Sequence, residues 1–164
     1  MDGWNRSSTV NGKIFTALSY LTLDAISSAQ VLFMNNYFAE DLLIDVAALK
    51  QSVYNGSWTL DDMLTYMRLA SLDNGDGEWT FEDRYGLSYN LWGGRAMLWS
   101  AGLALSKISE DGTISQTYTA SRNVDIFQKL YQFFNSNPYS YYGGGAGSVE
   151  SPVGAEALFF ANRA

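Results

Sequence analysis

Apolar and polar residues follow two different periods along the chain, one typical of strands and the other of helices. Strands are predicted where β-branched or aromatic residues follow turn-forming ones, at Asn11 to Tyr20 (NGKIFTALSY) and at Ser27 to Asn35 (SSAQVLFMN). Between residues 36 and 55, apolar residues recur at spacings of three and four, which predicts one or two short helices. The first third of the chain is therefore predicted to contain two strands followed by one or two helices.

The strongest helix signal lies at residues 60 to 71. Thr59 is followed three residues later by Asp62, in the manner of the capping box that begins many helices. Apolar residues then recur along one face of this helix, at Leu60, Met63, Leu64, Met67 and Leu69. We expect this face to contribute to the hydrophobic core.

The second half of the chain carries further alternating signals. They predict a short strand in RYGLSYN (residues 84 to 90), a helix at residues 93 to 105 and a hairpin that turns at Asp111-Gly112. Another helix is predicted at residues 122 to 135, with one apolar face formed by Val124, Phe127, Leu130, Tyr131 and Phe134. A loop rich in Tyr and Gly (YSYYGGGAG) precedes a last helical segment, GAEALFFANRA.

Length and composition fit one domain with a hydrophobic core. The chain has 164 residues, of which 47% are apolar and 15% aromatic. No repeat or linker divides it, and the mixture of strands and helices predicts a single α/β or α+β domain. No apolar run approaches the roughly 20 residues that span a bilayer, and no leader follows Met1. We therefore expect a soluble chain, with any export signal left out of this sequence.

Charge and residue content exclude several classes of function. The net charge of −7 repels phosphate backbones, so nucleic acid is not an expected partner. The chain contains neither cysteine nor histidine, which excludes disulfides, zinc sites built on sulfur or imidazole, and catalytic triads that use His. Any chemistry depends on carboxylates, hydroxyls, amides, the backbone and aromatic rings.

Several segments, in their order, resemble a known family. The segments NGKIFTALSY, SSAQVLFMNNYFAED, NGSWTLDDMLTYMRLAS, DNGDGEWTFEDRYGLSYN and ALFFANRA are similar to those of bacterial extracellular solute-binding proteins, the carbohydrate-binding components of ABC importers. The resemblance covers most of the chain, with Asn162 at a position where Gly is usual. It implies an α/β fold in which residues 1 to 164 form one lobe, the second, of a two-lobed periplasmic-binding-protein-like fold, with a mixed sheet flanked by helices.

The resemblance also implies a function and a location. Proteins of this family capture a sugar or oligosaccharide outside the membrane and deliver it to the permease subunits. The implied partners are thus the sugar, the missing first lobe of the same protein and the permease. The full-length protein is expected at the extracellular face of the cell membrane, anchored by lipid, or in the periplasm, and is not expected to be an enzyme.

A sugar site combines aromatic rings, which stack on the C–H patches of pyranose rings, with amides and charged groups that bind hydroxyls. At the predicted junction between a strand and a helix, such residues gather in YNLWGGRAMLW: Tyr89, Asn90, Trp92 and Arg95. The resemblance adds Tyr20 and Asp24 near the crossing strand, and Tyr142 is a candidate in the loop rich in Tyr and Gly. The alternative is that Trp92 and Trp99 are packing residues, as most tryptophans are.

The segment SLDNGDGEWTFED has the composition of a calcium-binding loop. Calcium loops of EF-hand type place oxygen ligands at alternate positions, a glycine at the sharp turn and a distal carboxylate. The candidate ligands are Asp73, Asn74, Asp76, Glu78 and Asp83. Leu72 falls in the first ligand position and offers no side-chain oxygen, which favours the alternative of a solvated polar turn. No cofactor is required, and calcium is the one candidate.

Two other classes of function remain as alternatives. Glycoside hydrolysis uses two carboxylates that flank the scissile bond, but the acidic pairs of this chain, such as Asp61-Asp62 and Glu82-Asp83, are sequence neighbours that do not face each other. A stand-alone carbohydrate-binding module or a calcium-stabilised interaction domain is the second alternative. Such modules are usually all-β, whereas the two patterned helices favour a solute-binding lobe.

Overall fold

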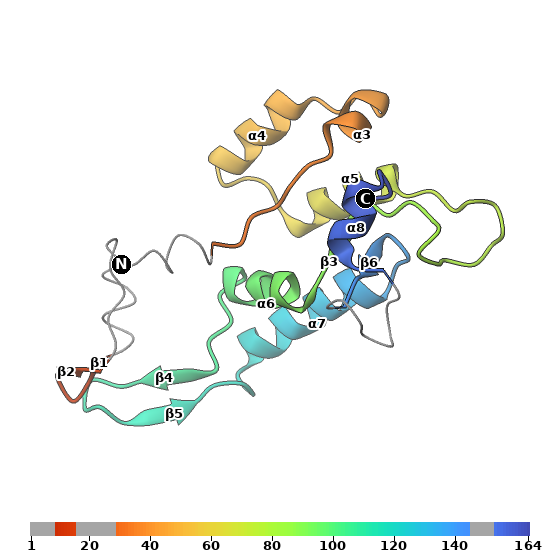
Figure 1. Cartoon of the computed structure of the whole chain (residues 1–164). Helices are drawn as coiled ribbons and strands as arrows, with labels where there is room; N and C mark the ends of the chain where they lie inside the picture. Colours follow the sequence, from red (N-terminus) through yellow and green to blue (C-terminus); the bar gives the residue numbers. More distant parts are fainter. Residues whose placement is uncertain (1–8, 16–28, 145–152) are drawn as a thin grey trace. The chain divides into compact units, whose positions relative to one another are not determined.

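The computed structural model of the chain describes residues 9–15, 29–144 and 153–164. Helices contain 42% of these residues and strands 13%, so the chain has a mixed α/β structure, as predicted. It divides into two compact units, one made of residues 1–32 and 98–127, the other of residues 33–97 and 128–164 (Figure 1). That residues 1–164 form one lobe of a longer protein stays a prediction.

The first unit contains a short antiparallel hairpin near the N-terminus. Strands β1 (Thr9–Val10) and β2 (Lys13–Ile14) are joined by Asn11 and Gly12, whose φ angles are 50° and 71°. Positive φ at both central residues is the signature of the tight turn that suits the twist of a hairpin. The predicted strand at residues 11–20 thus begins inside this turn, and its part from residue 16 lies outside the described residues.

A second antiparallel hairpin follows in the same unit. Strands β4 (Ser106–Ile108) and β5 (Ile114–Gln116) pair with Ile108 opposite Ile114. The backbone reverses through Asp111 and Gly112, where φ of the glycine is 81°. The predicted hairpin is therefore confirmed, together with its turn.

The helices of the described residues are α3 (Asn36–Asp41), α4 (Val46–Tyr54), α5 (Leu60–Ala70), α6 (Leu91–Ser100), α7 (Ser121–Asn135) and α8 (Ala155–Phe160). They confirm the helices predicted at residues 36–55, 60–71 and 122–135 and the helical segment near residue 160. Helix α6 ends earlier than predicted, because Gly102 adopts a φ of 86° and its N–H bonds to the carbonyl of Trp99. None of these helices is long and apolar enough to cross a bilayer.

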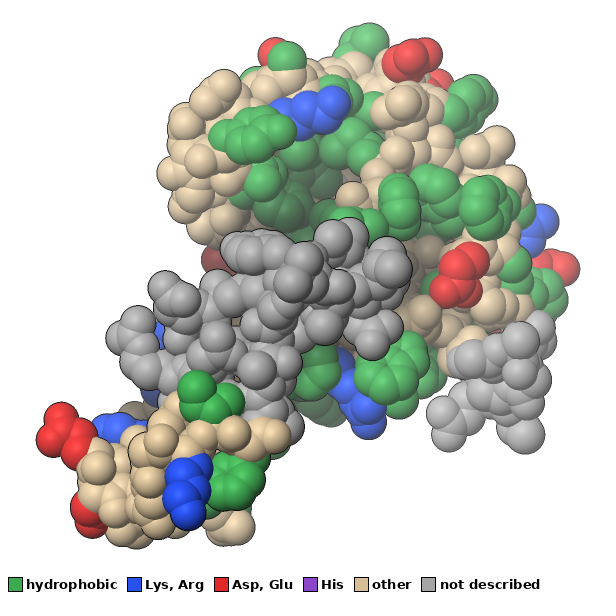
Figure 2. Space-filling view, turned by 60° about the vertical axis from the view of Figure 1, so that its left-hand side comes forward, with side chains coloured by type: hydrophobic (Ala, Val, Ile, Leu, Met, Phe, Trp, Pro, Cys, Tyr) green, Lys and Arg blue, Asp and Glu red, His purple; other side chains and the backbone are tan. Residues whose placement is uncertain are grey.

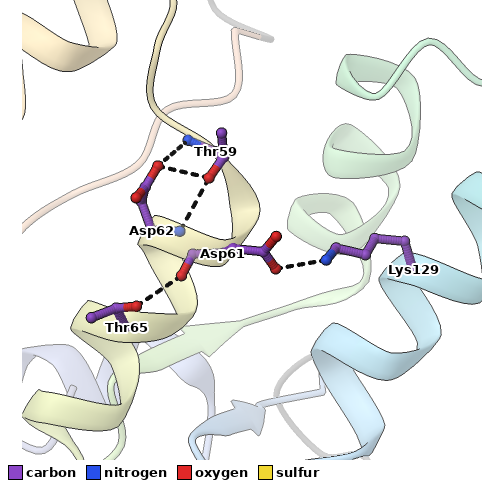
Figure 3. A network of polar contacts seen from close by, with 5 residues as sticks. All are labelled: Thr59, Asp61, Asp62, Thr65 and Lys129. Carbon is purple, nitrogen blue, oxygen red and sulfur yellow. Dashed lines mark hydrogen bonds and ion pairs between the residues drawn. The ribbon is translucent and has the colours of Figure 1, made fainter.

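Helix α5 begins with the predicted capping box. The Thr59 hydroxyl accepts a hydrogen bond from the Asp62 N–H at 3.2 Å, and the Asp62 carboxylate accepts one from the Thr59 N–H at 2.9 Å (Figure 3). The neighbouring Asp61 forms an ion pair with Lys129 of α7, at 2.6 Å between Nζ and Oδ1. Both side chains of this pair are largely exposed, so the ion pair adds little to the stability that α5 gains from packing.

The core of the second unit forms where α5, α7 and β3 meet. Its buried members are Met63 and Met67 of α5, Leu87 of β3 and Phe133 of α7. The partly buried residues packed around them are Trp58, Leu60, Leu64, Tyr89, Met97, Phe134 and Tyr139. Burial of such side chains, at about 25 cal/mol for each Å² of apolar surface, is the main force that stabilises this unit.

The apolar face predicted for residues 122–135 is wrong in part. Val124, Phe127 and Tyr131 are between 39% and 67% exposed, whereas Phe133 is 3% exposed. The buried stripe in the second unit contains Leu130, Phe133 and Phe134, at spacings of three and four residues. The sequence contains enough aromatic residues on α7 to form two candidate faces, and contact with α5 selects one of them.

Strand β3 (Leu87–Tyr89) pairs in parallel with β6 (Ser140–Tyr142), with Tyr89 opposite Tyr142 (Figure 1). The short strand predicted in RYGLSYN is confirmed. Strand β6 lies within the segment predicted as a loop, so that prediction is wrong for residues 140–142. A strand of three residues is too short to show a period, and its partner lies more than 50 residues away in the sequence.

The strand predicted at residues 27–35 is also wrong for its described part. Residues 29–35 belong to no helix or strand, and Val31, Leu32 and Phe33 are between 60% and 75% exposed. A strand needs a neighbour for its backbone hydrogen bonds, and within the described ranges none pairs with this segment. Further apolar side chains are exposed on α3 and after it, among them Tyr37 and Leu43. The space-filling view shows hydrophobic side chains gathered at the surface on the face that it draws (Figure 2).

We predict that Gly86→Ala strongly destabilises the second unit. A Cβ atom at residue 86 would lie 2.2 Å from the Cα and carbonyl oxygen of Met67, and backbone atoms of a core helix cannot move aside. The free energy of unfolding, measured with urea, should fall by roughly 2–4 kcal/mol.

Gly93→Ala is the matched control, since its Cβ would meet nothing closer than 3.7 Å and the residue lies in α6. It should leave the stability unchanged or raise it by about 0.5–1 kcal/mol. Equal stabilities for the two variants would contradict the close packing of residue 86 against α5.

Candidate functional site

The end of β3 leads directly into the first turn of α6, and β6 runs parallel beside it (Figure 1). This arrangement brings together Tyr89, Asn90, Trp92, Arg95 and Tyr142, the five residues predicted for the sugar site that lie in the described part of the chain. Tyr20 and Asp24 lie outside the described residues. Ligands of α/β proteins commonly bind at the carboxyl ends of parallel strands, next to helix N-termini. We refer to this region as the β3–α6 junction.

Tyr89 is partly buried between two other aromatic rings. Its ring centroid lies 4.3 Å from that of Phe134 and 5.5 Å from that of Tyr142, its partner on β6. Burial raises the pKa of the Tyr89 phenol, and the neighbouring Tyr142 adds to this shift, so the group stays protonated at neutral pH. The rings of Tyr89 and Tyr142 thus pack against each other at the end of the paired strands.

Asn90 caps α6 with its side chain. Its Oδ1 accepts hydrogen bonds from the backbone N–H groups of Trp92 and Gly93, both at 3.1 Å. Its Nδ2 donates to the Oε1 atom of Glu156 in α8 at 3.0 Å. Sequence reasoning missed Glu156, because it lies 66 residues away and has no motif of its own. The only local signal was its place in the first turn of the last predicted helix.

Trp92 is 59% exposed, so it is not a core residue. The guanidinium carbon of Arg95, one helical turn further along α6, lies 5.2 Å from the centroid of its ring. Such cation–π contacts contribute about 0.5–1 kcal/mol at exposed sites and restrict the orientation of the ring. Trp99, the other residue predicted to pack, is 58% exposed. The junction therefore presents an oriented tryptophan beside an amide, a carboxylate and a guanidinium group.

The acidic loop is closed at its base by a β-bridge. The N–H of Leu72 donates to the carbonyl of Arg84 at 2.9 Å, and the N–H of Arg84 donates back at 3.0 Å. Asp83 is 1% exposed, and its carboxylate accepts hydrogen bonds from the N–H groups of Thr80 at 2.6 Å and Asn74 at 2.8 Å. Hydrogen bonding to Thr80 is the largest effect on the pKa of Asp83 and holds it below its usual value.

Three of the other predicted metal ligands accept hydrogen bonds from the backbone of the loop itself. Asp73, Asn74 and Asp76 each accept a hydrogen bond from the N–H two residues ahead, at 2.6, 3.0 and 2.8 Å; the last of these donors is Glu78. Consecutive turns of this kind are typical of polar loops. In the described ranges, His, Cys, Asp and Glu form no group of three placed to hold a metal ion. The geometry supports the polar-turn interpretation, and the calcium site stays a hypothesis.

Comparisons of this chain with protein-family models, with curated proteins and with solved structures find no match. The resemblance to solute-binding proteins therefore depends on the segments quoted above. Functional inference depends on the chemistry of the β3–α6 junction and of the acidic loop.

We predict that Asp83→Asn lowers the free energy of unfolding by about 1–3 kcal/mol at pH 7, because an amide group would face a backbone N–H that now bonds to a carboxylate oxygen. The pKa of Asp83 is lower in the folded chain than its usual value of 3.8. Its contribution is therefore complete above that value and is lost as the pH falls through the lower folded-state pKa. Urea unfolding at pH 7 and pH 3 should show a smaller difference between wild type and variant at pH 3.

Asp76→Asn is the matched control for this measurement. Its side chain accepts only the hydrogen bond from the Glu78 N–H at the exposed tip of the loop, which an Asn carbonyl also accepts. A variant at residue 76 that destabilises as much as Asp83→Asn would show that charge, and not burial of the Asp83 carboxylate, organises the loop.

We predict that the unfolding temperature is the same in calcium and in EDTA, because the oxygens of Asp73, Asn74, Asp76 and Asp83 already bond to backbone N–H groups. Differential scanning fluorimetry with magnesium as the control measures this directly. A rise of several degrees with calcium alone, lost in Asp83→Asn, would instead assign a calcium site to the loop, since a ligand of the native state raises its stability.

Proposed function

We propose that this chain is one lobe of the substrate-binding component of a bacterial ABC importer for a sugar or oligosaccharide, and that the β3–α6 junction is its half of the sugar site. The observation that carries this proposal is the exposed ring of Trp92, which contacts the Arg95 guanidinium and lies two residues after Asn90, the residue that bonds to Glu156. The family resemblance supplies the substrate class and the role in import.

The groups at the junction match the chemistry of a pyranose. The C–H patch of a sugar ring stacks on an aromatic face, and Trp92 offers the most exposed aromatic surface of the junction. Each sugar hydroxyl both donates and accepts hydrogen bonds, and the junction contains a guanidinium and an amide as donors and a carboxylate as an acceptor. The net charge of −7 suits an uncharged ligand better than an anionic one.

In the proposed mechanism, the sugar binds between this lobe and the missing first lobe, and a hinge then closes over it. The ligand favours the closed state through contacts that the open state lacks. The closed form presents both lobes to the permease subunits. In the full-length protein this takes place at the extracellular face of the membrane, with a lipid anchor, or in the periplasm.

Division of the site between two lobes predicts weak binding by this chain alone. If each lobe supplies about half of a binding free energy of roughly −8 kcal/mol, one lobe retains about −4 kcal/mol, which is a millimolar dissociation constant. The alternative of a stand-alone carbohydrate-binding module predicts micromolar binding by the same chain. The helix content of 42% also weighs against the usual all-β architecture of such modules.

We predict that a panel of neutral oligosaccharides, titrated to about 50 mM into ¹⁵N-labelled chain, shifts the NMR signals of Tyr89, Trp92 and Arg95 with a dissociation constant near 1 mM. Trp92→Ala should abolish these shifts at Tyr89 and Arg95, because the stacking surface is removed. Trp99→Ala is the matched control, since Trp99 has nearly the same exposure, 58% against 59%.

Two outcomes of this titration, and one of a separate hydrolysis assay, are informative. Shifts confined to other parts of the chain, or an equal loss in the Trp92 and Trp99 variants, would contradict the placement of the site. Micromolar binding would favour the stand-alone module. Release of the chromophore from a chromogenic glycoside would favour an enzyme over a binding protein.

A further inference from the structure

We propose that Glu156 is a positioning residue of the β3–α6 junction, which fixes the orientation of the Asn90 amide and, through it, the first turn of α6 that carries Trp92. The importance of this residue for sugar binding rests on the proposed function. Its role in the ligand-free chain depends only on the hydrogen bonds that Asn90 forms with Glu156, Trp92 and Gly93.

The argument begins with the polarity of the Asn90 amide, which has one acceptor end and one donor end. The first N–H groups of a helix have no partner within the helix, so α6 requires the acceptor end. Oδ1 meets this need by accepting from Trp92 and Gly93. Rotation of the amide by half a turn would place an NH₂ group against these N–H donors.

Glu156 selects the orientation that caps α6. A carboxylate has acceptor sites only, so its Oε1 can bond to the Nδ2 end of Asn90 but not to the Oδ1 end. Its 3.0 Å hydrogen bond is charge-assisted, which makes it stronger than a bond between two neutral groups. One contact on α8 thus specifies the amide orientation required at the start of α6.

Helix α8 is held firmly enough to act as this reference point. The Ser88 hydroxyl of β3 donates to the carbonyl of Ala155 at 2.9 Å. A Cβ at Gly143 would lie 2.0 Å from the Ala155 backbone nitrogen, so the chain after β6 touches the start of α8 without space between them. The N–H of Gly143 also donates to the carbonyl of Tyr89 at 2.9 Å. Ala155, the residue before Glu156, thus contacts both β3 and the residue that follows β6. These contacts fix the position of Glu156.

Two variants separate positioning from a general effect of charge at the N-terminus of α8. Glu156→Gln removes the charge but keeps a carbonyl oxygen at the same reach, so Asn90 keeps its partner. Glu156→Asp keeps the charge next to the helix N-terminus but is one methylene shorter, so it cannot reach Asn90 in the present geometry. Positioning predicts that Asp behaves as Ala, and that Gln has a smaller effect than either, because it keeps an acceptor at the same reach but loses the charge assistance and the acceptor-only character of the carboxylate. A charge effect predicts instead that Asp behaves as wild type and that Gln behaves as Ala.

The first readout is hydrogen exchange at the Trp92 and Gly93 amides, followed by ¹⁵N NMR in the ligand-free chain. Both amides should exchange about threefold to tenfold faster in Glu156→Ala and Glu156→Asp, the change expected when one supporting hydrogen bond is lost, and by a smaller factor in Glu156→Gln. The Asn90 side-chain NH₂ signal, assigned by its absence in Asn90→Asp, should move in the same two variants. Wild-type exchange in Glu156→Asp or in Glu156→Ala would overturn the proposal.

The second readout is the dissociation constant for the oligosaccharide that binds best, which should rise about threefold to tenfold in the Ala and Asp variants and by a smaller factor in the Gln variant. An unchanged constant in these variants would overturn the extension to ligand binding. If no sugar binds even the wild-type chain, the proposed function fails, and the exchange measurement still decides the role of Glu156. The two failures are thus distinguishable.

Discussion

The parallel pairing of β3 with β6 is the constraint on which the second unit depends. Its three residue pairs include Leu87, a core residue, and Tyr89, whose ring contacts Tyr142 and Phe134. Since the strands are parallel, both end at the same edge, where α6 follows one strand and Gly143 meets the start of α8 after the other. The same short pairing therefore fixes a side of the core and brings distant segments to the candidate site.

One kind of hydrogen bond organises both polar regions of this unit. In the acidic loop and at the β3–α6 junction, a side-chain oxygen accepts from backbone N–H groups that have no partner in a helix or sheet. The difference lies in exposure. Asp83 is almost fully buried and closes a loop, whereas Asn90 is only partly buried and leaves Trp92 exposed beside it. Similar local chemistry thus supports a structural loop in one place and a candidate ligand surface in the other.

Features that depend on neighbouring residues could be predicted from the sequence. The capping box of Thr59 and Asp62 and the hairpin turn at Asp111-Gly112 each depend on residues within a few positions, and both are present. Features that depend on distant contacts could not. Strand β6 exists because β3 pairs with it, and Glu156 enters the site because α8 packs at the end of both strands.

The same difference between local and distant contacts explains which features of the candidate site could be predicted. Tyr89, Asn90, Trp92 and Arg95 could be found because seven consecutive positions at a strand-to-helix junction contain them all. Their roles could not be assigned, because those roles depend on partners elsewhere: Phe134 and Tyr142 convert Tyr89 into a packing residue, and Glu156 engages the donor end of Asn90. The local sequence identified which functional groups lie at the junction. Tertiary contacts determine which of these groups pack, which cap the helix and which stay exposed.

The exposure of Trp92 has an energetic meaning for binding. An exposed side chain that is free to rotate loses entropy when a ligand orders it, which costs about 0.5–1.5 kcal/mol. Arg95 above the ring and the capped backbone at Trp92 restrict that motion before a ligand arrives. If the ring is ordered before binding, less of the stacking free energy is lost to this entropy cost, and the affinity is higher. Under the proposed function, a weakly binding half-site gains most from this arrangement, because a saving of about 1 kcal/mol is a quarter of a millimolar binding free energy.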